Sequence, residues 1–386
     1  TILARGPYLV RSARVAGSDS LALAGDTTAP TTLEVYAPSH TTKLSWNGRR
    51  LVTRRESDGA LYAHLPGPRP VGLPALAGWR TRPGSPESDP GFDDSRWTAA
   101  GRGDLYVDTY GFHYGDAWYR GRFTATGAET ALSIDAITGR AGAYAAWLNG
   151  TYLGAQEADD DGKASRSFKL PASLLHAHAA NTIAVLLENS GHNEDGSHDD
   201  AHKQPRGITA IAFAGAAPEI AWRIAGNVED DPARGPMNSG GQFGERNGWY
   251  LPGFPDGAWR RAEPGAHGAG VRWYRTTFSL HVPRDQDASI ALQIDDTPDH
   301  RYRALIYVNG WLVGRYVNGV GPQDRFPLPN GILRTGGTNT LAISTWNMAA
   351  GSPDLGAISL KLLGNALTSL RVRDVRSPTY SQLFPR

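Results

Sequence analysis

The chain has 386 residues, of which 39 are basic and 38 acidic, so its formal net charge is +1. Such a balance gives no general field for holding nucleic acid or an anionic membrane, and no apolar run approaches the roughly 20 residues of a spanning helix. The absence of cysteine excludes disulfides, zinc–thiolate sites and a cysteine nucleophile. Many glycines and prolines, with 11 tryptophans and 15 tyrosines, indicate short strands joined by tight turns. We therefore expect an all-β protein of two or three domains.

Residues 1–72 predict a small β-sandwich. Short runs rich in β-branched and aromatic residues are separated there by Gly, Asp and Pro: YLVRSARV, SLALAG, TTLEVYA and KLSWNGRRLV. Asn47-Gly48 in the last run predicts a two-residue hairpin, because both turn positions need a positive φ. The proline-rich stretch LPGPRPVGLP that follows predicts a linker.

Beyond the linker the chain repeats itself at a long period. Six elements recur in the same order, including the motifs Trp118-Tyr119-Arg120 and Trp273-Tyr274-Arg275. About eight strands in each copy describe a double-sheet jelly roll. We expect jelly rolls over residues 73–216 and 217–365, and a C-terminal strand and extension over 366–386.

Two local patterns predict how the copies pack. The stretch RALIYV, residues 303–308, is apolar on both faces, which is typical of a strand covered on both sides. The paired Trp-Tyr-Arg motifs are interpreted as structural, with the aromatic rings in the core and the arginines bridging loops. The Asn-Gly pairs at 149 and 309 predict hairpins.

A polar run in the first copy raises the question of a metal site. Residues 191–207 read GHNEDGSHDDAHKQPRG, and His192, His198 and His202 alternate there with acidic residues, the ligand types that divalent cations choose. A run of Gly, Asn, Asp, Ser and His between two strands is equally typical of a long surface loop. Composition alone favours the surface loop, and the metal site stays an alternative interpretation at this point.

Separate motifs in a fixed order resemble a known family. The sequence of W-Y-R, N-G-x-x-x-G, F-x-L-P and N-T-[IL]-A is similar to the galactose-binding-type jelly rolls of large β-glycosidases. Over Gly6 to about Tyr380 the chain resembles the C-terminal region of glycoside hydrolase family 35 β-galactosidases of the large fungal and actinobacterial kind. The motifs that carry this resemblance are GPYLVRSA, SWNGRRL, GFDDSRW, GFHYGDAWYRGRF, PRGITAIAFAG, GGQFGERNGWYLPGFPDGAW and YVNGWLVGRYVNGVGPQDRFPLPNGIL.

The resemblance implies that the catalytic residues lie outside this sequence. Family members carry two catalytic glutamates on an N-terminal (β/α) barrel and hydrolyse terminal β-galactosides with retention, and nothing here matches that barrel. We therefore expect no catalytic residue and no cofactor in this chain, which should be inactive by itself and, starting directly before a strand at Thr1, a piece of a longer, secreted protein. Its expected partners are the barrel segment of the same precursor and galactosides or plant and other polysaccharide glycans, with neither nucleic acid nor a membrane.

The resemblance also suggests binding residues. Asn189, Glu194, Asp195 and Arg206 match a loop that leans toward the barrel mouth in the relatives, and we interpret it as a substrate-rim or docking loop. Gly196 stands where the relatives have Trp, so a stacking platform for a sugar is missing there. This match favours the loop over the metal site, and we assign no metal ligand.

A second group of residues predicts a sugar surface. An aromatic face beside charged hydrogen-bonding groups suits a pyranose. The possible sugar contacts are Glu245, Arg246, Trp249, Tyr250 and Trp311. The competing interpretation makes such a tryptophan a packed anchor between domains.

Two other function classes remain open. The chain could be a free-standing carbohydrate-binding module in which one jelly roll keeps a galactose site that depends on Trp249 or Trp311. It could also be an enzyme of different chemistry that uses the Asp, Glu and His side chains of residues 192–202.

Overall fold

The computed structural model describes residues 2–101, 103–191, 204–226 and 240–384. In this part of the chain almost all regular structure is β-strand, arranged in six sheets, and the α-helices are the single turns α1 (Phe243–Arg246) and α2 (Tyr380–Leu383). The predicted all-β fold is confirmed. No helix within these residues is long and apolar enough to cross a membrane.

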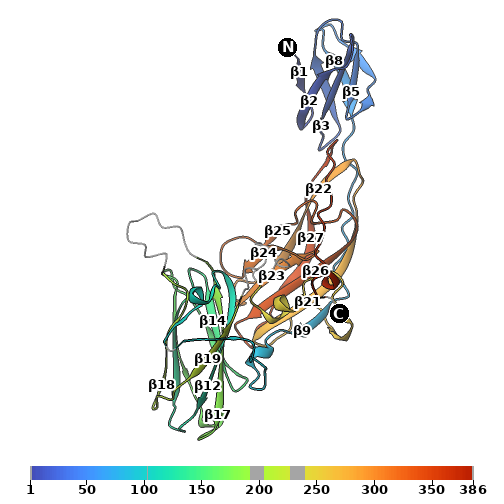
Figure 1. The fold of residues 1–386 in the computed structure, drawn as a ribbon. Coiled ribbons are helices and arrows are strands. Elements are labelled where there is room, and N and C mark those ends of the chain that lie inside the picture. Colours follow the sequence, from blue (N-terminus) through green and yellow to red (C-terminus); the bar gives the residue numbers. More distant parts are fainter. Residues whose placement is uncertain (1, 102, 192–203, 227–239, 385–386) are drawn as a thin grey trace.

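A small sandwich forms the N-terminal end of the structure (Figure 1). One four-stranded sheet has the order β1 (Leu3–Arg5), β4 (Thr31–Tyr36), β8 (Leu61–Leu65), β7 (Thr53–Arg55). The other has the order β2 (Leu9–Val15), β3 (Ser20–Asp26), β5 (Lys43–Trp46), β6 (Arg49–Arg50). Asn47 and Gly48 have φ of 48° and 80°, so the predicted two-residue hairpin between β5 and β6 is confirmed.

Two jelly rolls follow, each with a six-stranded sheet and a smaller one. In the first roll the large sheet has the order β10 (Thr98–Ala99), β19 (Ala221–Ala225), β12 (Gly115–Thr124), β17 (Ala180–Asn189), β14 (Ala143–Leu148), β15 (Thr151–Glu157). Its smaller sheet has the order β11 (Leu105–Tyr106), β18 (Gly207–Ala214), β13 (Ala131–Ile137), β16 (Lys163–Lys169).

The second roll repeats this plan. Its large sheet has the order β20 (Arg260–Arg261), β9 (Arg80–Pro83), β21 (Gly270–His281), β26 (Gly336–Asn347), β23 (Tyr302–Val308), β24 (Trp311–Val317). Its smaller sheet has the order β25 (Arg325–Pro327), β22 (Gln286–Asp295), β27 (Ala357–Leu367).

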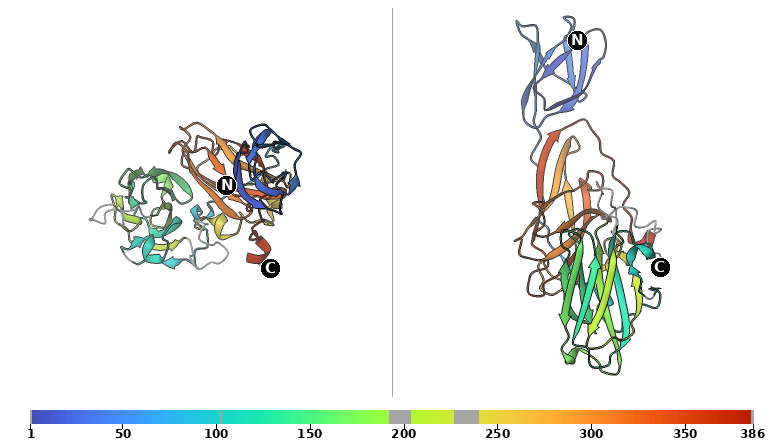
Figure 2. Two further views of the ribbon diagram at one scale, coloured as in Figure 1. Left: turned by 90° about the horizontal axis from the view of Figure 1, so that it is seen from above. Right: turned by 90° about the vertical axis from the view of Figure 1, so that its left-hand side faces the viewer.

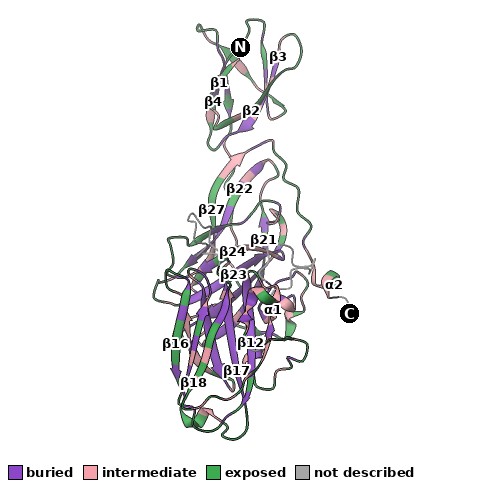
Figure 3. Ribbon diagram, turned by 60° about the vertical axis from the view of Figure 1, so that its left-hand side comes forward, coloured by how far each residue is buried: buried purple, intermediate pink, exposed green. Residues whose placement is uncertain are grey.

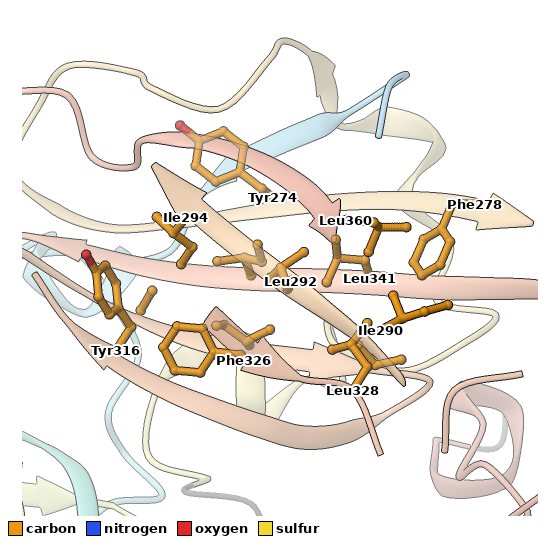
Figure 4. Close-up of a cluster of buried hydrophobic side chains, with 14 of the residues drawn as sticks. Tyr274, Phe278, Ile290, Leu292, Ile294, Tyr316, Phe326, Leu328, Leu341 and Leu360 are labelled. Atoms are coloured by element: carbon orange, nitrogen blue, oxygen red, sulfur yellow. The ribbon is translucent and has the colours of Figure 1, made fainter. Parts of the chain in front are cut away.

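Each roll encloses its own apolar core between its two sheets. In the second roll, Ile290, Leu292 and Ile294 alternate along β22 and point inward, as the two-residue period of a strand requires (Figure 4). They meet aromatic side chains such as Tyr274 and Phe278 from β21. The first roll has an equivalent core around Tyr119 and Tyr144.

The large sheets of the two rolls also share an apolar layer. Trp118 and Trp147 of the first roll and Trp273 and Trp346 of the second belong to one buried cluster. Every residue of β14 and β23 is therefore buried, because one face meets the roll's own core and the other meets the neighbouring roll. Figure 3 shows β23 as buried. The prediction that RALIYV is covered on both sides is confirmed.

Each roll contributes one strand to the sheet of the other, so the predicted boundaries at residues 73 and 216/217 are wrong for these two strands. β9 precedes the first roll in the chain but pairs with β21 of the second, where Thr81 lies opposite Tyr274 (Figure 1). β19 precedes the second roll but pairs with β12 of the first, where Ile224 lies opposite Tyr119. Residues 80–83 and 221–225 thus lie on the other side of the predicted boundaries. In the sequence, β9 lies directly before the first copy and β19 directly before the second. Hydrogen bonding instead places β9 in the sheet of the second copy and β19 in that of the first.

The C-terminal segment also differs from its prediction. β27 ends at Leu367, and the described residues after it form the short helix α2 instead of a further strand. The tail returns along the second roll, where the Tyr380 ring lies 5.1 Å from that of Phe254. Leu370 and Val372 alternate with arginines in this segment, but they are 45% and 56% exposed, so no buried apolar face holds it as a strand. Pro378 also lacks the N–H that a strand ladder needs.

Candidate functional site

The tryptophan-rich layer between the rolls contains most of the residues that the sequence suggested as sugar contacts. Glu245, Trp249 and Tyr250 are at most 3% exposed. The Trp249 ring lies 5.0 Å from that of Trp259 and 6.1 Å from that of Trp273. The structure therefore gives these residues a packing position and leaves no open face on Trp249 for a pyranose, which corrects the predicted sugar surface.

The turn of helix α1 fixes Glu245 in this layer. Its carboxylate accepts hydrogen bonds from the backbone N–H of Gly240, at 2.8 Å, and of Gln242, at 3.0 Å, and the latter forms part of a capping box. The hydroxyl of Tyr307, on β23 of the second roll, also donates to it. With these partners Glu245 serves to hold the helix against the second roll.

Further carboxylates lie buried beside Glu245. Asp116 on β12 is directly opposite Glu188 on β17, and Gln242 donates to it at 2.7 Å. Burial and repulsion from Glu188 and Glu245 together raise the pKa of Asp116 to about 8, although the hydrogen bond from Gln242 opposes the rise. Asp116 is therefore protonated at neutral pH.

A network of polar contacts connects these acids across the two rolls. Gln242 accepts a hydrogen bond from Ser344 on β26, so one side chain joins Asp116 of the first roll to the second. Glu188 is paired with Arg303 of β23 at 2.6 Å. Gln242 and Arg303 thus tie these acids into the contact between the two rolls, and the raised pKa of Asp116 is a property of this interface.

Arg246 completes the interface on the other side of α1. It forms an ion pair with Glu87, which is fully buried, and its guanidinium lies 5.4 Å from the centre of the Trp97 ring. Burial raises the pKa of Glu87 to about 7, and the positive charges of Arg246 and Arg120 oppose the rise. Glu87 precedes the first roll's body, whereas Arg246 comes after that roll, so this pair closes a long loop of the chain.

The paired Trp-Tyr-Arg motifs occupy equivalent positions in the two rolls. Arg120 donates to Asp94 at 2.9 Å, and Arg275 donates to Asp256 at the same distance. The remaining guanidinium nitrogens of both arginines donate to loop carbonyls, so the prediction that they bridge loops is confirmed. The tryptophan of each motif points into the shared layer and the tyrosine into the core of its own roll.

The aspartates of this arrangement were missed in the sequence, although a signal was present. GFDDSRW and GFPDGAW place Asp94 and Asp256 three residues after equivalent glycines, and they place Phe92 and Phe254 beneath the two guanidinium groups, at 5.5 and 5.4 Å. Comparison of the two copies beyond their strands would have found both.

The predicted rim or docking loop is fixed at both of its ends. Asn189 ends β17, donates to the carbonyl of Phe112 at 3.0 Å and accepts from the N–H of Gly191 at 2.9 Å. Arg206 donates to the Gly191 carbonyl at 3.1 Å, and its backbone N–H donates to Asp108 at 2.6 Å. The structure thus brings Asn189 and Arg206 together through Gly191, and both side chains are buried.

The remaining predicted residues lie elsewhere. Glu194 and Asp195, and the histidines 192, 198 and 202 of the metal hypothesis, lie outside the described residues. Within the described part of the chain, no group of three or more His, Asp or Glu side chains is arranged to hold a metal ion. Trp311 begins β24 directly after the Asn309-Gly310 hairpin and is half-buried, outside the layer around Trp249.

Comparison with known families gives matches to most of the chain. The family described as "Beta-galactosidase second all-beta domain" matches twice, at residues 87–193 and 243–351. The family described as "Beta-galactosidase, domain 3" matches residues 1–62. The two matches to the first family coincide with the bodies of the two jelly rolls.

Curated relatives are similar over nearly the whole chain. A protein of Penicillium rubens named "Probable beta-galactosidase C" is 38% identical over 389 residues, which cover 94% of this chain and 39% of the relative. The protein of the same name from Aspergillus oryzae is 36% identical, and the match covers 93% of this chain and 39% of that protein. "Probable beta-galactosidase B" of Sclerotinia sclerotiorum is 35% identical, with 92% and 37% covered. The chain therefore spans about two fifths of the length of these relatives.

Solved structures give only distant likenesses. A β-glucuronidase from Bacteroides uniformis has a TM-score of 0.25 at 15% identity, with 76% of this chain and 32% of that chain covered. An α-L-rhamnosidase from Streptomyces avermitilis has a TM-score of 0.20 at 14% identity, with 88% of this chain and 34% of that chain covered. Similarity at this level has no bearing on the site.

Proposed function

Because the chain belongs to the β-galactosidase family, of which it represents the C-terminal all-β part without the catalytic barrel, we propose that it is a non-catalytic accessory region of a longer enzyme. The observation that carries this proposal is the family match itself, which covers the sandwich and both rolls and leaves no stretch for a barrel. In this role the chain braces the barrel and shapes the rim of its active site.

The chemistry of the buried carboxylates supports a non-catalytic role. A retaining glycosidase needs two carboxylates about 5 Å apart beside a sugar pocket. Asp116, Glu188 and Glu245 lie together between the rolls, but Asp116 and Glu245 are at most 5% exposed, and all three are taken up by interface contacts. They cannot act as an acid/base and nucleophile on a glycoside.

The fixed ends of the rim loop support a contribution to the active-site edge. Asn189 and Arg206 hold the two strands β17 and β18 where the loop leaves and re-enters the first roll. The whole enzyme, in this proposal, is exported and removes terminal β-linked galactose with retention, and the loop faces the acceptor side of the barrel.

The proposal can be tested by reassembly. The remaining part of the same precursor would be expressed separately and mixed with this chain, and the complex would be followed by size-exclusion chromatography with light scattering. We expect a one-to-one complex and a higher melting temperature of the barrel-containing part. Two parts that remain separate at micromolar concentration would contradict a bracing role.

A further inference from the structure

An apolar groove of about 700 Å³ lies at one side of the first roll, between the edges of its two sheets. One wall of this edge groove is formed by residues 208–211 of β18, and the other by residues 218–222, which lead into β19. Figure 2 (left) shows the two rolls side by side, and β18 lies on the side of the first roll that faces away from the second (Figure 1). The second roll therefore does not cover the edge groove.

The lining of the edge groove is mainly apolar. Ile211, Ile220 and Trp222 are half-buried against the core of the first roll. The Trp222 ring lies 6.4 Å from that of Tyr119 in this core. Among the described residues that line the groove, only Glu219 is charged, and it is exposed. Because a sugar site needs precisely placed polar groups, these walls favour an aliphatic occupant over a sugar.

The equivalent edge of the second roll is covered by the chain itself. Trp79 and Trp222 are equivalent, because each stands two residues before the residue that lies opposite the tyrosine of a Trp-Tyr-Arg motif. Trp79 is only 2% exposed, whereas Trp222 is half-buried. Three aliphatic residues of the linker pack against the core to which Trp79 belongs, namely Val71, Leu73 and Leu76. The linker thus closes this edge of the second roll.

The corresponding residues of the first roll leave its groove open. At the same distances before Trp222 the chain has smaller or charged residues in place of the three linker residues, namely Ala214, Ala216 and Glu219. The indole N–H of Trp79 donates to the carbonyl of Leu76 at 3.2 Å, whereas the indole N–H of Trp222 has no partner among the described residues. The edge groove therefore offers aliphatic walls and a free hydrogen-bond donor, the two features that the linker satisfies in the second roll.

We propose that the edge groove binds an apolar segment of the remaining part of the same precursor. The segment sets aliphatic side chains against Ile211 and Ile220 and a main-chain carbonyl at the indole N–H of Trp222, as the linker does at Trp79. These features favour a polypeptide, because the second roll already binds one in this way. The Penicillium rubens relative, of which this chain covers 39%, has more than half of its length available as the partner. The inference rests on the proposed function, since it takes the barrel-containing part as that partner.

Titration calorimetry between the 386-residue chain and the separately expressed remaining part of the precursor tests the proposal. Ala100 lines the groove, and its backbone N–H donates to the Trp222 carbonyl at 3.0 Å. Ala100→Glu places a charge among the aliphatic walls and should weaken the complex at least tenfold, because burying an unpaired charge is costly. Ala212→Glu, at an exposed position of β18 that does not line the groove, is the matched control and should bind as the unaltered chain does. Both variants should keep a cooperative melting transition.

Hydroxyl-radical footprinting read by mass spectrometry locates the contact on the unaltered chain. Oxidation of Trp222 should fall severalfold when the complex forms. Unchanged oxidation of Trp222 in a stable complex, or unchanged affinity of the Ala100→Glu protein, would contradict this inference and leave the proposed function intact. No complex with the unaltered chain would contradict both. Dimers of the chain alone that protect Trp222 would assign the groove to a second copy and also overturn the proposal.

Discussion

Asp116 shows how one side chain can report on the contact between the two rolls. It lies under the polar network of Gln242 and Ser344, and its pKa is raised to about 8 because burial and two neighbouring acids penalise its charged form. In an unfolded chain an aspartate titrates near 3.9. Between these two values the folded state therefore holds a proton that the unfolded state has lost.

This difference predicts a pH-dependent stability. A carboxyl group with a raised folded pKa stabilises the protein at low pH, and this contribution is lost as the pH rises from about 4 to about 8. Asp116→Asn stays neutral and can still accept from Gln242. We expect the free energy of unfolding of the unaltered chain to fall relative to that of this variant, by up to about 1.4 kcal/mol per pH unit.

Urea unfolding at several pH values between 5 and 8 measures the effect. Asp135→Asn, at an exposed position on β13, is the matched control and should leave the pH profile unchanged. Parallel profiles for the unaltered chain and the Asp116→Asn protein would show that Asp116 is charged in the folded state.

The bridging arginines give a second prediction for single residues. Arg275→Met removes the ion pair with Asp256 and the hydrogen bond to the Leu251 carbonyl, and Asp256 then keeps the longer ion pair with Arg80, at 3.6 Å. We expect a loss of about 3–5 kcal/mol, as for other broken buried pairs. Arg261→Met, at an exposed position on β20, should change the stability by less than about 0.5 kcal/mol in the same thermal or urea unfolding experiment.

At the scale of elements, local patterns predicted strands well but did not predict their partners. The Asn-Gly hairpins and the doubly buried stretch at 303–308 depend on residues close in sequence, and the structure has both. The strand exchange depends on which sheet accepts β9 or β19. Trp79-Arg80 and Trp222-Arg223 look alike, so nothing within either strand indicates the roll with which it pairs.

The same distinction between local pattern and long-range packing explains why the sugar surface predicted around α1 was wrong. The sequence around Trp249 shows an aromatic and charged cluster, which suits a sugar surface and an interface equally well. Only the approach of the neighbouring large sheet decides between them, and that approach results from the packing of strands more than 90 residues away, such as β12 and β14. The ends of the rim loop could be placed because strands flank it on both sides.

The strand exchange makes a reciprocal prediction. Arg82→Pro in β9 should remove a hydrogen bond to β21 of the second roll, because residue 82 faces the same side as Gly84, which donates to Val271 of β21. Arg223→Pro in β19 should remove one to β12 of the first, and each change should cost about 3 kcal/mol. Amide hydrogen exchange should show lost protection in β21 for the first variant and in β12 for the second. The reverse pattern would mean that each strand pairs within its own copy.

The whole molecule consists of a sandwich on a narrow junction and two rolls that are tied together. Only one pair of backbone hydrogen bonds, between Thr27 and Leu367, joins the sandwich to the second roll in sheet fashion within the described residues. The rolls, in contrast, share a tryptophan layer and a strand in each direction. We expect the rolls to unfold as one unit and the sandwich to unfold separately.

Differential scanning calorimetry can test this cooperativity. Asp94→Ala weakens the first roll, where Asp94 pairs with Arg120 and Arg122, and Asp256→Ala weakens the equivalent site of the second. Both variants should lower the same single transition of the rolls by several degrees and leave the transition of the sandwich unchanged. Two roll transitions that respond independently would contradict the interlocked arrangement.

The central claim is that this chain is the accessory part of a β-galactosidase, and hydrolysis of a chromogenic β-galactoside tests it most directly. The purified chain, confirmed by intact mass to begin at Thr1, would be assayed alone and after mixing with the barrel segment of the same precursor. We predict no turnover by the chain alone and activity after mixing that exceeds that of the barrel segment by itself. Turnover by the chain alone would contradict the account, because it would require a catalytic carboxylate pair within these β domains.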